Sequence, residues 1–413
     1  MEKKYLKTQY ACFLTSFAGA AAANLSPLLF LTFHKLYGIS YSLLGLLVVI
    51  NFGTQLLFDL AFSFFSHRFD LKMSVKATPA VMTLGFVLYA VLPFFFPDNV
   101  YPCLVVGTVI FSAGGGLSEV LTSPTVSALP SKDPEKLLSL LHSCYAWGVV
   151  FFVTVTTLYL HFAGEENWQY LSFFFSALTI LASALFVGAE IPELSSAEKA
   201  SEAAGLFRNK NLILCVLCIF LGGASECTMS QWCSGYLEQA LGVPKLLGDL
   251  LGMALFGVML GLGRTLYSKY GKNTLNILLA GSVGASVCYI TAVVSRVPAL
   301  GLAACALTGF CVSMLWPGSL IVAEKRIPEG GVTMYALMAA GGDLGASVCP
   351  QLVGIITDAV IAGSRSAETA EKLGLGVDQL GMKCGMAFAA LFPICAIAVF
   401  LRLKNMPEKN PEA

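Results

Sequence analysis

Ser112-Ala113-Gly114-Gly115-Gly116-Leu117-Ser118-Glu119-Val120-Leu121-Thr122-Ser123-Pro124 is an apolar segment that carries a run of glycines and a single carboxylate. If the segment is helical, its small and polar side chains share one stripe at i, i+3 and i+4 spacing, opposite Val and Leu. A looser copy runs from Gly309 to Pro317, and in both copies a proline follows a glycine by eight positions. Duplicated apolar segments interrupted by Gly and Pro are typical of a binding site between two membrane-embedded halves.

The composition places the whole chain in a membrane. Of its 413 residues, 56% are hydrophobic and only 12% are charged, and the mean hydropathy is +0.76. Soluble domains carry about 25% charged residues. The formal net charge is zero, which argues against a nucleic-acid partner. The partners we expect are the lipid bilayer, a small-molecule substrate and protons.

A helix that crosses a bilayer needs about 20 mostly apolar residues. Twelve stretches meet this condition: 8–33, 41–65, 75–96, 101–129, 137–161, 168–190, 211–236, 247–268, 275–295, 299–323, 332–362 and 379–403. The longest polar connector lies between the sixth and the seventh. We therefore predict an all-α integral membrane protein with twelve transmembrane helices in two pseudo-symmetric six-helix bundles. The predicted domains are 1–190 and 211–413, joined by a cytoplasmic central loop over 191–210.

The basic residues set the expected orientation. With the N-terminus in the cytoplasm, roughly three quarters of the 25 Lys and Arg residues fall on the cytoplasmic side, as the positive-inside rule requires. This distribution predicts a multi-pass protein of the cell membrane with both termini in the cytoplasm. The first apolar run is long and lacks a cleavage site, so we expect it to be a span rather than a signal peptide.

Three carboxylates fall deep within predicted spans. At 1.5 Å per residue, Glu119 and Asp343 lie roughly 16 Å from the inner ends of their spans, and Glu226 roughly 22 Å. The hydrocarbon core is about 30 Å thick, so all three are near its middle. Ionisable groups at this depth are costly and usually face a cavity or a partner. These acids are therefore candidates for binding a substrate or a coupling ion.

Glu119 is the first candidate for proton coupling, and Glu226 is the second. A carboxyl group in low-dielectric surroundings can take up and release a proton near neutral pH. Glu226 follows Gly222 and Gly223, and these glycines leave room beside it. The alternative for Glu119 is a structural one, in which the buried Glu only hydrogen-bonds a neighbouring helix.

Further polar and aromatic side chains are candidates for contacts to a hydroxylated substrate. Amide and indole groups can donate hydrogen bonds, and an aromatic ring can stack on a sugar. The candidates are Asn24, Gln231, Trp232, Trp316 and Asp343. Asp343 stands between glycines that allow close helix contact, so a role in helix packing or gating is an equal alternative.

A second polar group is expected nearer the inner surface. Asp59 continues a helical face with Asn51 and Gln55, and lies about 9 Å from the inner end of its span. His142 is at a similar depth in span five. We predict that both belong to an inner gate with Arg68 or Arg264, rather than to the binding site.

In its twelve spans, central loop and two short basic loops, the chain resembles the major facilitator superfamily. The loop Ser66-His67-Arg68-Phe69-Asp70-Leu71-Lys72 is similar to that family's Asp-Arg-x-Gly-Arg/Lys loop, although His67 stands where Asp is usual and Asp70 where Gly is usual. The corresponding loop of the second half, Tyr267-Ser268-Lys269-Tyr270-Gly271-Lys272, keeps the Gly-Lys pair at Gly271-Lys272. The resemblance implies a secondary transporter that rocks two halves around a central site lined by spans one, four, seven and ten.

A narrower resemblance concerns the acids. Glu119, His142 and Gly222-Gly223-Ala224-Ser225-Glu226, followed by Trp232, are similar to sugar permeases of the fucose:proton symporter type. Those permeases typically add an acid on span one, where this chain has Asn24, Ser26 and Pro27.

We therefore predict a secondary active transporter that moves a small polar metabolite, a sugar or sugar derivative, by proton-coupled alternating access. The alternatives are proton-antiport efflux of drugs or metabolites, and a membrane sensor or scaffold that does not transport. A P-loop, a nucleophile elbow and a metal-binding motif are absent from the sequence, so we expect no enzyme, cofactor or metal site. Cys215 and Cys218 have metal-pair spacing but lie in an apolar run, where reduced thiols are expected. We expect a monomer. The sequence leaves the substrate and the direction of transport open.

Overall fold

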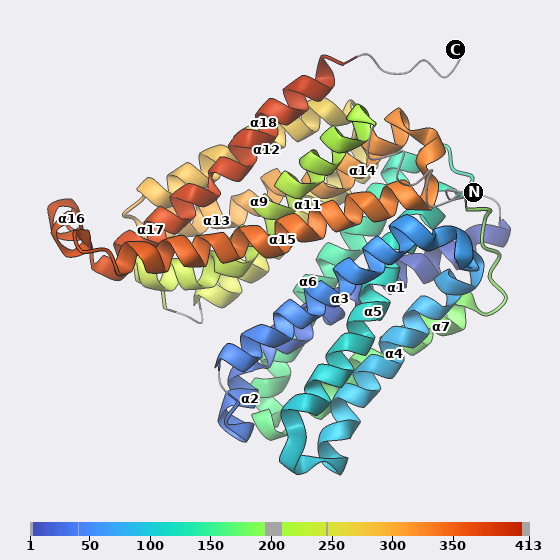
Figure 1. Ribbon diagram of the computed structural model, residues 1–413, viewed down its shortest axis with the longest axis horizontal. Coiled ribbons are helices and arrows are strands. Elements are labelled where there is room, and N and C mark those ends of the chain that lie inside the picture. The colour runs from blue at the N-terminus through green and yellow to red at the C-terminus, as the bar shows by residue number, and fades with distance from the viewer. Residues whose placement is uncertain (1–2, 40, 195–208, 245–246, 407–413) are drawn as a thin grey trace. The chain divides into compact units, whose positions relative to one another are not determined.

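The computed structural model describes residues 3–39, 41–194, 209–244 and 247–406, and every regular element in these ranges is a helix (Figure 1). The longer helices are α1 Leu6–Leu28, α2 Phe30–Tyr37, α3 Tyr41–Phe65, α4 Leu71–Phe95, α5 Val100–Ser127, α6 Pro134–Ala163, α7 Gln169–Phe186, α9 Lys210–Leu241, α11 Leu255–Tyr270, α12 Thr274–Val294, α13 Pro298–Val312, α14 Leu315–Arg326, α15 Gly331–Ile361, α16 Ser366–Leu373, α17 Val377–Ala389 and α18 Leu391–Lys404. A π-helix, η5 Gly248–Ala254, precedes α11. Short 3-10 turns are η1 Lys3–Tyr5, η2 Ser66–Arg68, η3 Pro97–Asn99, η4 Glu165–Asn167 and η6 Pro328–Gly330.

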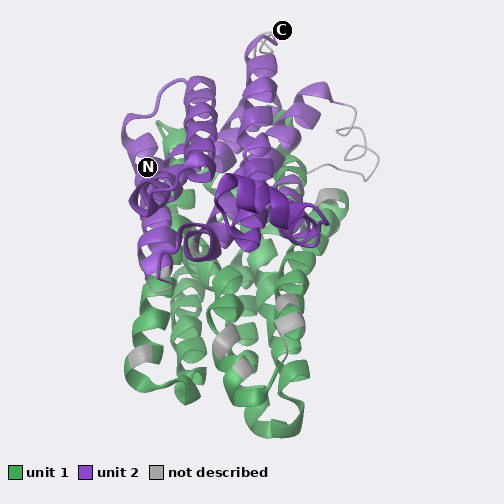
Figure 2. Ribbon diagram, turned by 90° about the vertical axis from the view of Figure 1, so that its left-hand side faces the viewer, with its two compact units in different colours: residues 1–208, 328–340 green, residues 209–327, 341–413 purple. Residues whose placement is uncertain are grey.

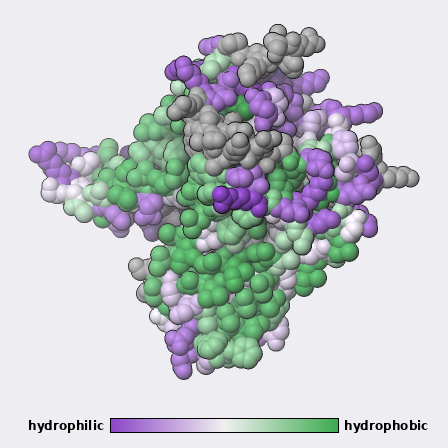
Figure 3. Space-filling model, turned by 45° about the vertical axis from the view of Figure 1, so that its right-hand side comes forward, coloured by the Kyte–Doolittle hydropathy of each residue, from purple (hydrophilic) through white to green (hydrophobic). Residues whose placement is uncertain are grey.

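The described residues contain 11 helical stretches long and apolar enough to cross a membrane, and α3 adds a shorter one, Leu46–Phe62. Each of the twelve predicted spans overlaps one of these stretches, with ends that differ by a few residues. Large apolar side chains such as Val49, Leu57 and Phe95 are exposed on the helices. Hydrophobic side chains form broad areas on the face seen in Figure 3. This surface is the one expected of helices whose outer sides face lipid.

The chain divides into two compact units, coloured in Figure 2. Unit 1 is residues 1–208 with Pro328–Ala340, and unit 2 is residues 209–327 with 341–413. The start of α15 belongs to unit 1, where Thr333 Oγ1 lies 3.3 Å from Ser66 Oγ and Tyr335 Oη lies 2.7 Å from Ser127 Oγ. The domain limits 1–190, 191–210 and 211–413 stay a prediction, and residues 195–208 of the expected loop lie outside the described residues.

Aromatic rings fill the core of unit 1. Trp168 is fully buried, and its ring meets that of Phe33 edge-on at 4.9 Å and that of Tyr89 at 5.7 Å. Tyr89 also places its hydroxyl 3.0 Å from Ser26 Oγ on α1. The cluster ties α1, α2 and α4 to Trp168 at the start of α7, because each ring contributes a large apolar area as well as a directional contact.

Helices α4 and α5 cross so closely that glycine is required at the contact. A Cβ placed on Gly85 would lie 2.2 Å from the backbone N of Phe111, and one placed on Gly107 would lie 2.6 Å from Tyr89 Cα. On the opening glycine run, a Cβ at Gly114 would lie 2.6 Å from Met82 Cγ. Small residues therefore set the spacing of these two helices, as is common in membrane bundles.

Replacing Gly85 by Ala should lower the thermal stability of the detergent-solubilised protein, because the obstructing atoms are backbone and cannot swing away. Overpacking of this kind costs about 1–3 kcal/mol. Gly53→Ala is the matched control, since Gly53 is also within a helix but a Cβ placed on it would meet no atom within 4 Å. We expect the control to be neutral or slightly stabilised. Equal melting temperatures for the two variants would contradict the packing argument.

Three of the predicted spans are broken in the structure. The breaks fall between α1 and α2, between α13 and α14, and between α17 and α18. Pro27 precedes the first break by two residues, and Pro317 and Pro393 are each the third residue of the helix that follows. Proline has no backbone N–H and leaves the carbonyl four residues earlier without its helical donor. For Pro317 this carbonyl belongs to Ser313, in the break itself.

Candidate functional site

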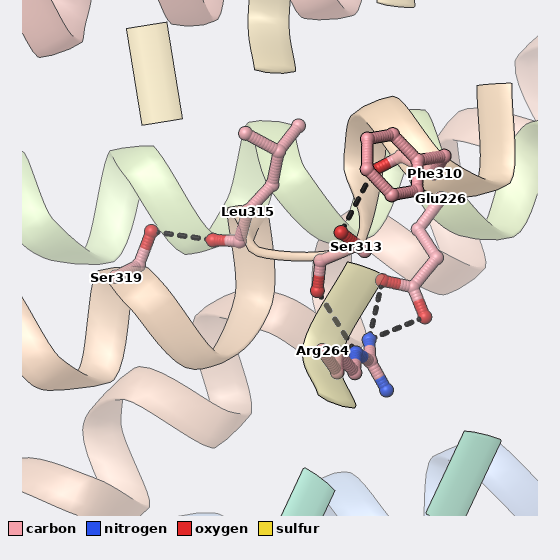
Figure 4. Close-up of polar contacts among 6 residues, drawn as sticks. All are labelled: Glu226, Arg264, Phe310, Ser313, Leu315 and Ser319. Carbon is pink, nitrogen blue, oxygen red and sulfur yellow. Dashed lines mark hydrogen bonds and ion pairs between the residues drawn. The ribbon is translucent and has the colours of Figure 1, made fainter. Parts of the chain in front are cut away.

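Glu226 and Arg264 form a buried ion pair in unit 2 (Figure 4). Glu226 lies on α9 and Arg264 on α11. Nη2 of Arg264 lies 2.9 Å from Oε1 and 2.8 Å from Oε2 of the carboxylate. The arginine side chain is 3% exposed and the glutamate side chain 11%. One guanidinium nitrogen therefore binds both carboxylate oxygens in surroundings from which solvent is nearly excluded.

The same guanidinium also binds the broken span. Nε of Arg264 donates to the carbonyl oxygen of Ser313 at 2.8 Å, the acceptor that Pro317 leaves open. Glycine brings the helices this close, because a Cβ on Gly263 would lie 2.2 Å from Ser313 Oγ. Three elements thus meet at one cation: α9, α11 and the break between α13 and α14.

A buried ion pair is a weak source of stability, because desolvation of the two charges offsets much of their attraction. Removing one partner is costly, since the other charge is left buried and uncompensated. Ionisable groups within a membrane domain usually serve a pathway or a binding site. The pair of Glu226 and Arg264 is therefore the strongest candidate site among the described residues of unit 2.

Trp316 packs between α9 and α15, close to two of the predicted acids. A Cβ on Gly223 would lie 2.9 Å from its Cζ3, and one on Gly342 would lie 2.3 Å from its Cη2. Gly223 is one helical turn before Glu226, and Gly342 is followed by Asp343, which is 4% exposed. The half-buried Trp316 ring thus lies within a turn of both acids along the helices it contacts.

Trp232 and Gln231 lie further along α9. The indole N–H of Trp232 donates to the backbone carbonyl of Pro350 on α15 at 3.0 Å, and its ring faces Gly354. Gln231 is exposed. The indole donor of Trp232, expected to bind a substrate, therefore has a protein acceptor in this structure. The role of Gln231 as a substrate contact stays a proposal.

In unit 1, a polar network centred on Asn51 joins three helices. Its Oδ1 accepts from Ser112 Oγ at 2.6 Å and from Gln55 Nε2 at 2.9 Å, and its Nδ2 donates to Ala22 O at 3.0 Å. The glycine run accommodates Gln55, since a Cβ on Gly115 would lie 3.3 Å from its Oε1. The network joins α1, α3 and α5 through buried side-chain hydrogen bonds.

Glu119 lies on the face of α5 that carries Ser112 and Gly115, one turn beyond the glycines, and is half-buried. One turn further, Ser123 Oγ lies 3.3 Å from Nε2 of His142 on α6. Asp59, two turns beyond Asn51 on α3, is fully buried. Glu119 thus follows the Asn51 network along α5 and precedes the contact between Ser123 and His142.

The remaining predicted residues have local contacts. Asn24 donates from Nδ2 to Ala20 O of its own helix at 2.8 Å. Arg68 is exposed, with its guanidinium 5.5 Å from the centre of the Phe65 ring. Arg264, expected at a gate, is bound to Glu226 within unit 2.

The network of Asn51, Gln55 and Ser112 was not among the predicted site residues. Its signal was present in the i, i+4 spacing of Asn51 and Gln55, but its partner Ser112 is 61 positions further along the chain. Similarly, the carbonyl of Ser313 has no sequence signal except Pro317.

The sequence matches the profile of the Major Facilitator Superfamily over residues 11–350. The chain therefore belongs to the major facilitator superfamily, which consists of membrane transporters and not of enzymes. It is a multi-pass secondary transporter, and the predicted all-α membrane fold is confirmed. No curated protein matches the sequence.

Solved structures of two symporters are similar to this chain. The structure of FucP in the outward conformation aligns with a TM-score of 0.77 at 16% identity, covering 98% of this chain and 100% of that one. A variant of the same E. coli fucose:proton symporter aligns at 0.72 and 17% identity, with 98% and 100% covered. The proton:xylose symporter XylE aligns at 0.74 and 14% identity, with 96% and 97% covered. At these identities the likeness shows the fold alone.

Proposed function

We propose that this transporter carries a small polar metabolite, a sugar or sugar derivative, into the cell together with protons. The observation that carries the proposal is the buried ion pair between Glu226 and Arg264 at the break in span ten. Charged groups at such a position are functional by default in a membrane protein. The symporters FucP and XylE share the fold and are described as coupling fucose and xylose to protons, which supports the same class of function.

In this proposal the acids have separate roles. Glu119 takes up and releases a coupling proton in unit 1, and Glu226 does the same in unit 2. The protonation of Glu226 controls its ion pair with Arg264. Contacts to the substrate come from Trp316, which packs against the turns that carry Glu226 and Asp343, from Asp343 itself, and from Asn24, Gln231 and Trp232. Asp59, Arg68 and His142 are proposed to form the inner gate.

The proposed setting is the cell membrane, with the protein as a monomer and both termini in the cytoplasm. The distribution of Lys and Arg among the loops supports this orientation. Efflux of lipophilic cations is the second transport candidate, and it is the outcome that the experiment below separates from uptake.

Proteoliposomes test the proposal directly. With an inside-alkaline pH gradient, a radiolabelled sugar or sugar derivative should accumulate above its external concentration, and a protonophore should collapse the accumulation. Liposomes without protein are the control. Uptake that does not depend on the pH gradient would contradict proton coupling. If only lipophilic cations moved, driven by the gradient, efflux would replace uptake as the proposed function. Specific binding without any flux would indicate a sensor.

A further inference from the structure

Three basic side chains are buried among those that the structure describes: Arg264, Arg326 and Lys383. Two of them bind the ends of helices. Arg326 donates to Leu403 O at 2.7 Å near the end of α18, and Lys383 donates to Val293 O at 2.7 Å and to Ser295 O at 2.8 Å at the end of α12. Cations commonly satisfy the last carbonyls of a helix, so these two have a structural explanation.

Arg264 differs, because its charge is opposed by a side-chain carboxylate in the middle of a span. Its guanidinium is also held independently of that carboxylate. Nε is bound to the carbonyl of Ser313, so Glu226 receives both of its hydrogen bonds from Nη2. The pair therefore lacks the parallel fork in which Nε and Nη2 each bind one carboxylate oxygen. The cation has an anchor that stays in place when Glu226 leaves.

The close packing of α11 reinforces this anchor. Gly263, the residue before Arg264, lies against Ser313, and a Cβ on Gly309 would lie 2.3 Å from Phe256 O. The guanidinium is therefore fixed by its backbone and by Ser313, whereas Glu226 reaches it from α9. Of the two charged groups, the carboxylate is the one that can be exchanged.

Resting on the proposed function, we propose that the substrate is a sugar acid whose carboxylate replaces that of Glu226 on Arg264. The exchange conserves charge: the buried guanidinium keeps an anionic partner when Glu226 moves away. A neutral sugar in the same place would offer the guanidinium no carboxylate in exchange for that of Glu226, and removing one partner of a buried ion pair is costly. Guanidinium is also the side-chain group best matched to carboxylate. Aldonates and uronates combine this anion with the hydroxyl groups of a sugar.

A matched pair of ligands tests the proposal on the purified full-length protein in detergent. D-galacturonate should raise the melting temperature, and D-galactose, which has the same ring without the carboxylate, should bind at least about tenfold more weakly. Equal or tighter binding of galactose would overturn the proposal. Gluconate and glucose form a second pair, for which the same preference is expected.

Substitutions test whether the preference for the sugar acid depends on Arg264. Arg264→Gln should abolish binding of the acid, whereas Arg296→Gln, which removes an exposed arginine bonded to Leu373 O, should leave it unchanged. Because Arg264→Gln removes a buried group, Glu226→Gln provides an independent test. This variant lacks the competing anion, so it should bind galacturonate about tenfold more tightly than the natural protein. Unchanged or weaker binding of the acid to Glu226→Gln would overturn the proposal.

The two proposals fail in different ways. Tight binding of the acid with no gradient-driven flux would support the carboxylate site and contradict proton-coupled transport. Gradient-driven uptake of neutral sugars that galacturonate does not inhibit would support proton-coupled transport and overturn the carboxylate site.

Discussion

Replacing Glu226 by Gln will lower the free energy of unfolding of the ligand-free protein by about 3–5 kcal/mol, because the buried guanidinium of Arg264 loses the carboxylate that it binds. A double variant, Glu226→Gln with Arg264→Met, should recover most of this loss, since neither charge then remains in the apolar interior. Transport should stay absent in the double variant. Thermal unfolding in detergent and flux in proteoliposomes measure the two properties separately.

An exposed ion pair is the control. Lys372 Nζ lies 2.6 Å from Glu368 Oε1 on α16, and both side chains are mostly exposed. Solvent screens such a pair, so Glu368→Gln should leave the melting temperature unchanged. A double variant as unstable as Glu226→Gln would show that the loss arises from packing at Glu226, and would contradict the electrostatic explanation.

Replacing Glu119 by Gln should abolish proton-driven accumulation and leave counterflow exchange of the substrate intact. Glutamine keeps the size of the side chain and can still hydrogen-bond, but it cannot take up or release a proton. Exchange requires only that the loaded carrier reorients, whereas accumulation requires the proton. Both are measured in the same proteoliposomes, one with a pH gradient and one with unlabelled substrate inside.

Glu368→Gln again serves as the control, because it removes an exposed carboxylate from α16 without touching a span. It should accumulate substrate at the natural level. Undiminished accumulation by Glu119→Gln would remove Glu119 from the coupling step. Loss of both accumulation and exchange would assign Glu119 to substrate binding or to the packing of α5.

The spans were predictable because a long apolar run has few alternatives to a membrane helix. The breaks within them were not, since proline alone does not decide. Pro124 and Pro350 lie inside the unbroken helices α5 and α15, whereas Pro317 accompanies a break. At the break with Pro317, the released carbonyl of Ser313 accepts a hydrogen bond from Arg264 on another helix.

The candidate site was predictable in parts. Glu226 was identified by its depth within a span, and Arg264 by its positive charge. The two residues were expected in different roles, however. Their pairing depends on the tertiary positions of α9 and α11, and on Gly263, whose contact with Ser313 brings Arg264 to the break. Residues 38 positions apart on different helices have no sequence spacing that would reveal such a pair.

The division of α15 between the two units bears on how the protein can be cut. A gene split at the central loop would place Pro328–Ala340 on the C-terminal fragment, although these residues pack within unit 1 through Ser66 and Ser127. The N-terminal fragment would therefore lack residues 328–340, which pack within unit 1, until the C-terminal fragment bound to it. Fragment complementation should succeed only when both halves are synthesised together, and chimaeras between homologues should exchange residues 328–340 with the first half.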